Sequence, residues 1–311
     1  MTVFYVFAAV LAALALFILI SAYVSYRIAF YSDKKKKPDI FKRLEGDEEW
    51  QKQIRDNIER LRALDFEHVY ITSRDGLRLH GYFRRGNEGA PLALMCHGYR
   101  SSPFVDFSGG GLLAMEKGFS ILLIDQRAHG ESEGKAITFG VLERFDVLDW
   151  ATVMTEQYGF EKIILYGVSM GAATVIMAGE LALPSSVIGI FADCPFSAPD
   201  EIISKVTRDM GLPPAVFSFP TRIGAWLFAG FNLKASAAKR AIKSCTLPVL
   251  IVHGDADGYV PHYMSADIFA AREDGTVFLS FPGADHAMSY ITDCERYKGA
   301  IKDFEAKILE R

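Results

Sequence analysis

The fold of this chain is indicated most clearly by the stretch IILYGVSMGAA at residues 163–173. An apolar run leads into the pattern Gly-x-Ser-x-Gly, and small residues that are compatible with a helix follow directly. A strand that turns sharply into a helix holds Ser169 in a strained position, with its hydroxyl exposed above the sheet edge. Gly167 and Gly171 lack the Cβ atoms that would clash in so tight a turn. The stretch therefore predicts a serine nucleophile between a strand and a helix.

Two further strand-and-loop segments lie downstream and carry the groups that activate a serine. Residues 248–261 form an apolar run followed by a loop with two carboxylates, Asp255 and Asp257. Residues 276–286 form a second apolar run followed by a loop that contains His286. A neutral imidazole must take the serine proton, and a carboxylate must orient that imidazole and stabilise its cation. The segments thus predict a Ser-His-Asp triad in which either aspartate could be the acid.

The order Ser, Asp, His, with each residue on a loop after a strand, resembles the order found in α/β-hydrolases. Residues 92–99, LALMCHGY, resemble the third strand of that family and its His-Gly-x oxyanion turn. Residues 121–132, ILLIDQRAHGES, resemble its Asp-x-Arg-x-x-Gly-x-Ser loop after strand four. From Phe66 onward the chain is similar to a small bacterial-type serine esterase or acylhydrolase. The resemblance implies an α/β fold, in which helices flank a mostly parallel sheet.

The same resemblance assigns a role to each site residue. Ser169 is the expected nucleophile, Asp257 the expected acid and His286 the expected base. The backbone N–H groups of Tyr99 and Met170 are expected to form the oxyanion hole, which stabilises the negative charge of the tetrahedral intermediate. These five residues make up the catalytic site that the resemblance implies.

The remaining polar residues near these motifs are expected to support the site. The family pattern His-Gly-x-x-Asp-x-x-Val-Pro places the acid at Asp257, so Asp255 is expected to cap its own loop. His97 and His129 lie beside glycines in turns, where an imidazole typically hydrogen-bonds to the backbone. His253 is expected to pack below the site.

Length, charge and the placement of cysteine and histidine limit the classes of protein to which this chain could belong. The chain has 311 residues, which suffice for one large α/β domain with an appendage, and half of them are hydrophobic. A formal net charge of -4 gives no reason to expect a nucleic-acid partner. The four cysteines are scattered, so we expect reduced thiols. No His or Cys pair has the spacing of metal ligands, so we expect neither a metal site nor a cofactor.

Residues 1–26 are predicted to form a single transmembrane helix. Residues 3–20 are apolar without interruption, and about 20 such residues cross a bilayer. A cleaved signal peptide is an alternative, although its apolar core is shorter and normally follows a positive charge. A buried helix of a soluble protein is a second alternative. Arg27 and the four lysines at 34–37 follow the apolar run, so the positive-inside rule places the catalytic domain in the cytoplasm.

The rest of the chain is expected to have two parts. Residues 27–65 are predicted to be a basic linker and a helical stalk, because apolar residues recur at helical spacing over residues 39–64. Residues 66–311 are predicted to be the α/β-hydrolase domain. Within it, residues 196–246 follow the sixth strand and exceed what the basic fold needs. The resemblance implies that they form a cap insertion over the acyl pocket. The alternative is that individual residues of this segment are simply core of a helical excursion.

The predicted function is hydrolysis of a carboxylic acyl ester through an acyl-enzyme intermediate. A membrane anchor and an aromatic cap, with Phe217 and Trp226 as expected pocket walls, favour an apolar or lipid-like ester. Thioesterase, lysophospholipase and oligopeptidase-like reactions use the same triad and are alternatives. A non-catalytic binding protein is a further alternative, which the complete triad disfavours. The expected partners are a small-molecule acyl ester and the membrane, and the oligomeric state stays open.

Overall fold

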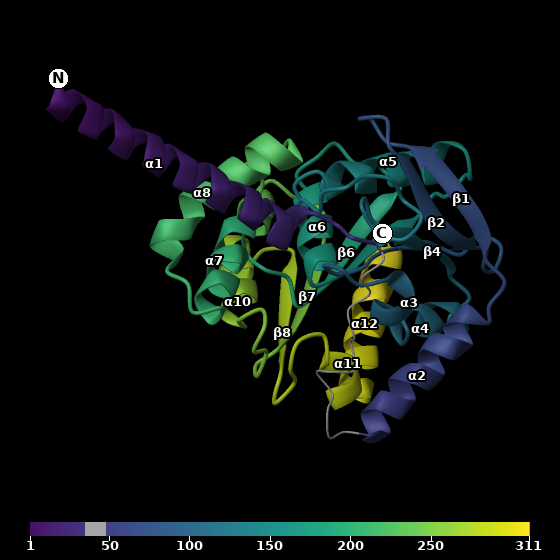
Figure 1. Ribbon diagram of the computed structural model, residues 1–311. Helices are drawn as coiled ribbons and strands as arrows, with labels where there is room; N and C mark the ends of the chain where they lie inside the picture. The colour runs from purple at the N-terminus through teal and green to yellow at the C-terminus, as the bar shows by residue number, and fades with distance from the viewer. Residues whose placement is uncertain (35–47, 311) are drawn as a thin grey trace.

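The computed structural model describes residues 1–34 and 48–310 (Figure 1). These residues form an eight-stranded sheet with helices on both faces and the strand order β1-β2-β4-β3-β5-β6-β7-β8. The expected fold class, an α/β fold with a mostly parallel sheet, is therefore confirmed. Lysines 35–37 of the predicted linker and residues 39–47 of the predicted stalk lie outside the described residues.

The sheet begins with an antiparallel hairpin and continues as a parallel sheet. β1 pairs with β2, and β2 pairs with β4, in antiparallel fashion, whereas the other neighbouring pairs are parallel. The parallel part directs the carboxyl ends of its strands to one edge, where the loops that follow β3, β5, β7 and β8 meet. The strands are β1 (Glu67–Thr72), β2 (Arg78–Arg84), β3 (Leu92–Cys96), β4 (Ser120–Asp125), β5 (Ile163–Val168), β6 (Val187–Asp193), β7 (Val249–Gly254) and β8 (Thr276–Phe281).

The central strands are buried on both faces, which explains why they are nearly continuous apolar runs. The first face is covered by α5 (Glu143–Glu156), α6 (Met170–Ala178), α9 (Ala238–Ala241) and α10 (Tyr263–Ala271). The second face is covered by α2 (Glu48–Arg62), α3 (Pro103–Asp106), α4 (Gly110–Glu116), α11 (Ser289–Thr292) and α12 (Cys294–Leu309). The predicted stalk thus contains α2, which packs on the body through the fully buried Leu61.

The segment between β6 and β7 holds two longer helices, α7 (Pro199–Asp209) and α8 (Pro214–Ala229), before the short α9. Each of the two starts with proline, which the first turn tolerates because its N–H has no partner within the helix. Gly230 ends α8 with a φ of 74°, the left-handed conformation common at helix ends. Figure 1 shows α8 beside the C-terminal part of the first helix, α1, and α7 packs against α8.

The N-terminal segment is one long helix. α1 (Thr2–Ser25) continues as a short π-helix, η1 (Tyr26–Phe30), and the combined helix is long and apolar enough to cross a membrane. In Figure 1 the N-terminal part of α1 projects from the body, whereas its C-terminal end packs against α8. The predicted transmembrane segment 1–26 therefore corresponds to a helix with the length and composition of a single span.

The chain directly after α1 is packed into the body, in a region where the sequence predicts a linker. Phe30 is fully buried, and its ring packs edge-on against Phe139 and Phe231 at 5.9 and 5.3 Å. Tyr31 forms an isolated β-bridge with Ala136. These contacts fix the direction of α1 relative to the sheet.

Candidate active site

The serine of the Gly-x-Ser-x-Gly pattern lies at the turn between β5 and α6. Its backbone has a φ of 55° and a ψ of -113°, a conformation that residues other than glycine rarely adopt. A Cβ atom on Gly167 would lie 2.3 Å from the carbonyl oxygen of Gly171, and one on Gly171 would lie 1.8 Å from that of Cys96. Both positions are therefore glycine for steric reasons, and the strained turn holds Ser169 at the N-terminus of α6.

The structure brings Ser169, His286 and Asp257 into one hydrogen-bonded chain. Nε2 of His286 lies 2.9 Å from Oγ of Ser169, and Nδ1 of His286 lies 2.7 Å from Oδ2 of Asp257. His286 comes from the loop after β8 and Asp257 from the loop after β7, and all three residues are buried. A carboxylate can only accept, so Nδ1 donates to it. Nε2 is then the nitrogen that can take the serine proton.

Both oxygens of Asp257 are held by hydrogen-bond donors. Oδ1 accepts from the backbone N–H groups of Tyr259 and Val260 at 2.8 and 2.7 Å, and Oδ2 also lies 3.0 Å from Nε2 of His253. Burial alone would raise the pKa of Asp257. Hydrogen bonds from His253 and His286 outweigh burial and hold this pKa well below its ordinary value. Asp257 is therefore ionised at every pH at which His286 needs a negative partner.

Two neighbours of the acid have supporting contacts. Oδ1 of Asp255 accepts from the backbone N–H of Gly283 at 2.7 Å, so this side chain ties the loop after β7 to the loop after β8. His253 is fully buried, and its Nδ1 lies 2.6 Å from Oγ of Ser265. That contact fixes the ring whose other nitrogen reaches Asp257. The sequence predicts that His253 packs below the site, but its direct contact with the acid depends on the loop conformation.

The expected oxyanion-hole residues, Tyr99 and Met170, both border a cavity at Ser169. Met170 begins α6, so its N–H is one of the terminal groups that have no acceptor within the helix. Tyr99 follows Gly98, whose N–H donates to Oδ2 of Asp106 at 2.5 Å. Asp106 therefore fixes the turn that carries the Tyr99 amide, and no motif in the sequence indicates this role. Donation from the two amides to an oxyanion stays a prediction.

Two histidines near this turn hydrogen-bond to the backbone, as their places beside glycines predict. Nδ1 of His97 donates to the backbone oxygen of the next residue at 2.8 Å, and its Nε2 accepts from the N–H of Gln126 at 3.2 Å. His129 lies 2.9 Å from the backbone oxygen of Arg127 and 3.1 Å from the backbone nitrogen of Arg100. Burial lowers the pKa of each imidazole to about 4, so each ring is neutral and can both donate and accept.

A cavity of about 330 Å³ opens beside Ser169 and is lined mostly by apolar side chains. Its walls come from the body, including Phe139 and Phe196, from α7 and α8, and from the last turns of α1. Phe217 lines the cavity, as the sequence predicts. The same expectation for Trp226 is wrong, because this side chain is 69 % exposed and outside the lining. Nine residues separate the two on α8, which at about 100° per residue places them on opposite faces.

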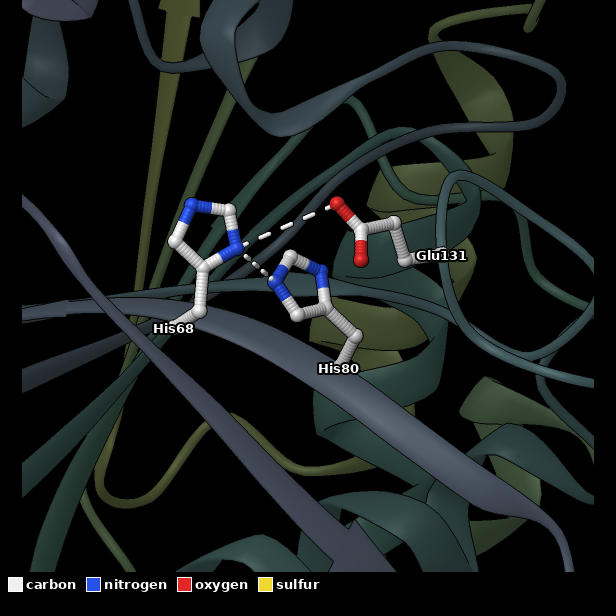
Figure 2. Close-up of side chains that lie close together, drawn as sticks. All are labelled: His68, His80 and Glu131. Atoms are coloured by element: carbon white, nitrogen blue, oxygen red, sulfur yellow. Dashed lines mark hydrogen bonds and ion pairs between the residues drawn. The ribbon is translucent and has the colours of Figure 1, made fainter.

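Figure 2 shows a separate group of side chains that could bind a metal ion, with His68 on β1, His80 on β2 and Glu131 after β4. Nδ1 of His68 lies 2.9 Å from Nε2 of His80 and 3.8 Å from Oε1 of Glu131. Nδ1 of His80 donates to Asp125 at 2.7 Å, a carboxylate contact typical of zinc-binding histidines. Strand pairing creates this cluster, so spacing in the sequence could not indicate it. Among the described residues, it shares none with the triad or the cavity.

A second group with ligand-type atoms consists of Cys194, Asp257 and His286. Burial raises the pKa of the Cys194 thiol well above its ordinary value, so the thiol stays protonated. Metal binding requires the thiolate, and the other two residues already bond to each other within the triad. This group therefore belongs to the surroundings of Ser169 and not to a separate metal centre.

Comparisons with known proteins agree with this architecture. A family model described as "Alpha/beta hydrolase family" matches residues 93–298. The uncharacterized protein YqkD of Bacillus subtilis is 24% identical over 302 residues, which cover 94% of this chain and 95% of that protein. Thiohydrolase aneE of Aspergillus aculeatus is 31% identical over 134 residues, 42% of each chain. The esterase Pf2001 of Pyrococcus furiosus has a TM-score of 0.64 and 21% identity, covering 80% of this chain and 93% of that chain.

The family match extends from within β3 to α12 and includes all three residues of the Ser-His-Asp chain. Because the identity to the solved esterase is 21%, this likeness shows a common fold and no more. Because the family match spans more than half of the sequence, this chain belongs to the alpha/beta hydrolase family.

Proposed function

We propose that this protein is a serine hydrolase that cleaves carboxylic esters with an apolar acyl group through an acyl-enzyme intermediate. The observation that carries the proposal is the hydrogen-bonded chain of Ser169, His286 and Asp257, which opens into an apolar cavity. The strained serine backbone and the ionised, buried acid are features of a nucleophile site. A complete triad also argues against the alternative of a non-catalytic binding protein.

Acylation begins when Oγ of Ser169 attacks the carbonyl carbon of the ester. Nε2 of His286 takes the hydroxyl proton as the new C–O bond forms, and Asp257 stabilises the imidazolium without accepting a proton itself. The amides of Tyr99 and Met170 donate to the carbonyl oxygen, on which negative charge develops. The tetrahedral intermediate then loses its alcohol, and His286 gives that leaving group its proton.

Deacylation repeats these steps with water as the nucleophile. His286 takes a proton from the water as its oxygen attacks the acyl carbon on Ser169. The second tetrahedral intermediate breaks the bond to Oγ, and His286 returns a proton to the serine. The products are a free carboxylic acid and the starting enzyme. Each proton transfer passes through His286.

The cavity favours an apolar acyl group. Phe139, Phe196 and Phe217 contribute aromatic walls, and the volume of about 330 Å³ lies at the lower end of common ligand sites. Each methylene that leaves water for such a site contributes about 0.8 kcal/mol. We therefore expect kcat/KM to rise with acyl-chain length until the chain fills the cavity.

A thioester is the second candidate substrate, because a named thiohydrolase is 31% identical over 134 residues. The same triad can attack a thioester carbonyl, with a thiol as the leaving group. Comparison of an acyl thioester with the p-nitrophenyl ester of the same acid separates the two substrate classes. A much higher kcat/KM for the thioester would favour the thioesterase assignment.

Membrane attachment through α1 is part of the proposal. The large apolar side chains of α1, such as Phe4, Leu16 and Phe17, are exposed, which disfavours a buried helix of a soluble protein. Cleavage of a signal peptide after α1 would remove contacts with α8, because Ala22 is fully buried against Gly224 and Oγ of Ser25 accepts a hydrogen bond from Oγ1 of Thr221. An uncleaved anchor keeps both the apolar span and these contacts.

The proposed orientation follows from the cations beside α1. Arg27 and Lys34 lie after the apolar run, so the positive-inside rule places the catalytic domain in the cytoplasm. The full-length protein is expected to sediment with membranes and to resist extraction by high salt. A reporter that is active only in the cytoplasm should work when it is fused to the C-terminus. Activity of an exported reporter such as alkaline phosphatase would contradict this orientation.

A fluorophosphonate probe tests the proposed chemistry, because it reacts with a serine that a neighbouring base activates. We expect labelling of the natural protein and none of Ser169→Ala. Ser186→Ala removes another buried serine hydroxyl and should be labelled normally. Hydrolysis of p-nitrophenyl butyrate by Ser169→Ala should fall at least about 10⁴-fold. Equal labelling of Ser169→Ala and the natural protein would contradict the assignment of Ser169 as the nucleophile.

A further inference from the structure

The end of α1 packs closely against α8, which lies within residues 196–246, the cap insertion that the family resemblance implies. Ala22 is fully buried, and a Cβ atom on Gly224 of α8 would lie 2.4 Å from the backbone oxygen of Ala22. The two helices therefore cross at small residues, which lets their backbones approach closely. Oγ1 of Thr221 donates to Oγ of Ser25 at 3.1 Å on the same side. Figure 1 shows the resulting pair, with α8 beside the last turns of α1.

The chain beyond α1 contacts the turn that carries the proposed oxyanion donor. The hydroxyl of Tyr99 donates to the backbone oxygen of Ala29 at 2.8 Å, and Nη2 of Arg100 donates to that of Ile28 at 2.8 Å. The ring of Tyr99 also stacks on Phe139 at 5.0 Å. The end of the helix and the catalytic turn thus form one packed unit.

One face of α1 lines the cavity at Ser169. The lining residues on this helix and its extension include Ile20, Ser21, Val24 and Ile28. Positions 20, 24 and 28 are four residues apart, which is the spacing of a single helix face. At 1.5 Å per residue this face extends for about 12 Å. The cavity therefore runs along the helix, away from the catalytic turn and toward the apolar span.

The cavity has a mouth, which we define as Ile20 and Val24 on α1 together with Met210 and Leu212 between α7 and α8. All four side chains line the cavity and are nevertheless 54, 46, 54 and 38% exposed, respectively. A mouth edged by large apolar side chains is unfavourable in water and favourable in lipid. The mouth thus has the chemistry of a surface that faces a bilayer.

The place of the mouth along α1 matches the edge of a bilayer. Residues 2–21 supply about 30 Å of helix, which is the thickness of the hydrocarbon core. Val24 then lies at the boundary. Tyr23 packs at 5.4 Å against Phe228 of α8, on which Trp226 is exposed. Tyrosine and tryptophan are enriched at membrane interfaces, so α8 is positioned to rest there.

We propose that the substrate is a bilayer-resident ester whose acyl chain passes sideways from the membrane, through the mouth between α1 and the cap, into the cavity at Ser169. α1 is then a wall of the acyl site as well as an anchor. This inference rests on the proposed function, because it assigns a substrate class and a route to the same site. The ester carbonyl enters the cavity together with the chain, because Oγ of Ser169 must reach the carbonyl carbon to attack it.

The kinetic test uses the full-length enzyme in phosphatidylcholine and phosphatidylglycerol vesicles. p-Nitrophenyl palmitate is supplied in the bilayer and p-nitrophenyl butyrate in the water. Met210→Glu places a carboxylate in the mouth, where lipid disfavours charge. We expect the ratio of palmitate to butyrate hydrolysis to fall at least about tenfold. An unchanged ratio would overturn the proposal.

The matched control introduces the same charge at another exposed apolar side chain. Val277→Glu changes a residue on β8 that does not line the cavity, and it is expected to leave both rates unchanged. A fall in the ratio for Val277→Glu as large as that for Met210→Glu would show that surface charge, and not the mouth, causes the effect. Such a result would also overturn the proposal.

A photocrosslinking experiment tests the route independently of catalysis. Ser169→Ala in vesicles is irradiated with a fatty ester that carries a diazirine at the chain end, and mass spectrometry locates the crosslinks. Phe196 and Ile202 line the cavity and are buried, so lipid outside the protein does not reach them. We expect crosslinks at these residues, and fewer in the presence of Met210→Glu. Crosslinks confined to the exposed residues 3–17 would contradict the route.

The two experiments separate failure of the inference from failure of the proposed function. Crosslinks at Phe196 without any ester hydrolysis would support the lipid route and contradict the proposed chemistry. Hydrolysis of both esters that requires Ser169, together with an unchanged ratio in Met210→Glu, would support the chemistry and contradict the route.

Discussion

The nucleophile turn and the acyl cavity share Ser169 but are built in different ways. The turn is mostly local, because Gly167, Gly171 and the strand that precedes them lie within residues 163–173. A Cβ atom on Gly167 would lie 2.3 Å from Gly171, and only the 1.8 Å contact of Gly171 involves a distant residue, Cys96. The cavity combines the body, α7, α8 and the end of α1, which are far apart in the sequence. Close packing across these segments, such as that of Ala22 on Gly224, holds it together.

This difference separates the chemistry of the site from its choice of substrate. The turn and the loops after β7 and β8 supply proton transfer and charge stabilisation, which every ester requires. The cavity walls decide which acyl groups can reach the serine. Changes in the first region should therefore lower activity toward all substrates, whereas changes in the second should alter the preferred chain length or the stability of the assembled walls.

The largest expected effect lies in the first region, from Asp257→Asn. An amide cannot hold His286 in the required tautomer, so kcat should fall by up to about 10⁴-fold for every ester while the fold persists. Asp255→Asn removes a carboxylate from the same loop and should cost far less, because Asp255 contacts Gly283 and not the imidazole. Steady-state kinetics with p-nitrophenyl butyrate compares the two variants. A larger loss in Asp255→Asn would show that the loop register is wrong.

The next largest effect tests whether the segment after α1 belongs to the body. Phe30→Ala empties a fully buried site between Phe139 and Phe231 and should lower the free energy of unfolding by about 3–5 kcal/mol. Phe17→Ala makes the same truncation at an exposed position on α1 and should leave the body's stability unchanged. Denaturant unfolding in detergent, followed by tryptophan fluorescence, measures both. Equal stability of the two variants would place the segment outside the core.

A smaller effect concerns the support beneath the triad. Asp193 ends β6 and accepts from the hydroxyl of Tyr297 at 2.9 Å, and burial raises the pKa of Asp193 from 3.8 to about 6. Between about pH 4 and pH 6 the folded protein keeps a proton that the unfolded chain has lost. This contribution to stability is fully present below about pH 4 and is lost as the pH rises through about 6.

Asp193→Asn should remove that dependence. As the pH rises over this range, the free energy of unfolding of the natural protein should fall by about 3 kcal/mol. The variant should not show this fall. Denaturant unfolding at several pH values between these limits gives the difference between the two proteins. Parallel pH profiles would show that Asp193 has no raised pKa.

The smallest effect is expected in the cavity wall, from Phe217→Ala. This change shortens a wall residue on α8, so the preference for palmitate over butyrate esters should change by roughly tenfold. Trp226→Ala removes an aromatic side chain from the opposite face of α8 and should leave the profile in detergent solution unchanged. A panel of p-nitrophenyl esters of increasing length provides the measurement. A larger shift in Trp226→Ala would mean that the cavity lies elsewhere.

The parts of the site that the sequence predicts are those with a local cause. The apolar runs and turn residues around Ser169 predict a strand, a tight turn and a helix, and the structure contains all three. The loop with Asp257 follows the buried strand β7 and the loop with His286 follows the edge strand β8, and parallel pairing brings the carboxyl ends of these strands together with that of β5. The residues alone allow Asp255 as an alternative acid, whereas the family resemblance assigns the acid to Asp257.

The parts that the sequence does not predict depend on packing between distant segments. Asp106 and His253 support the site through contacts that no motif encodes. The direction of the Trp226 side chain depends on how α8 is rotated about its axis against α1. An apolar run such as residues 3–20 indicates a span, but only the folded chain shows that the end of that helix also lines a cavity.

The central claim is that Ser169 attacks an ester that comes from the bilayer, and rapid-quench mass spectrometry tests it most directly. The full-length enzyme in vesicles is mixed with p-nitrophenyl palmitate, quenched at early times and digested. The expected result is a palmitoyl group on the peptide that contains Ser169, formed before free palmitate accumulates. Continued turnover with no acyl group on Ser169, or with the acyl group on another residue, would contradict the claim.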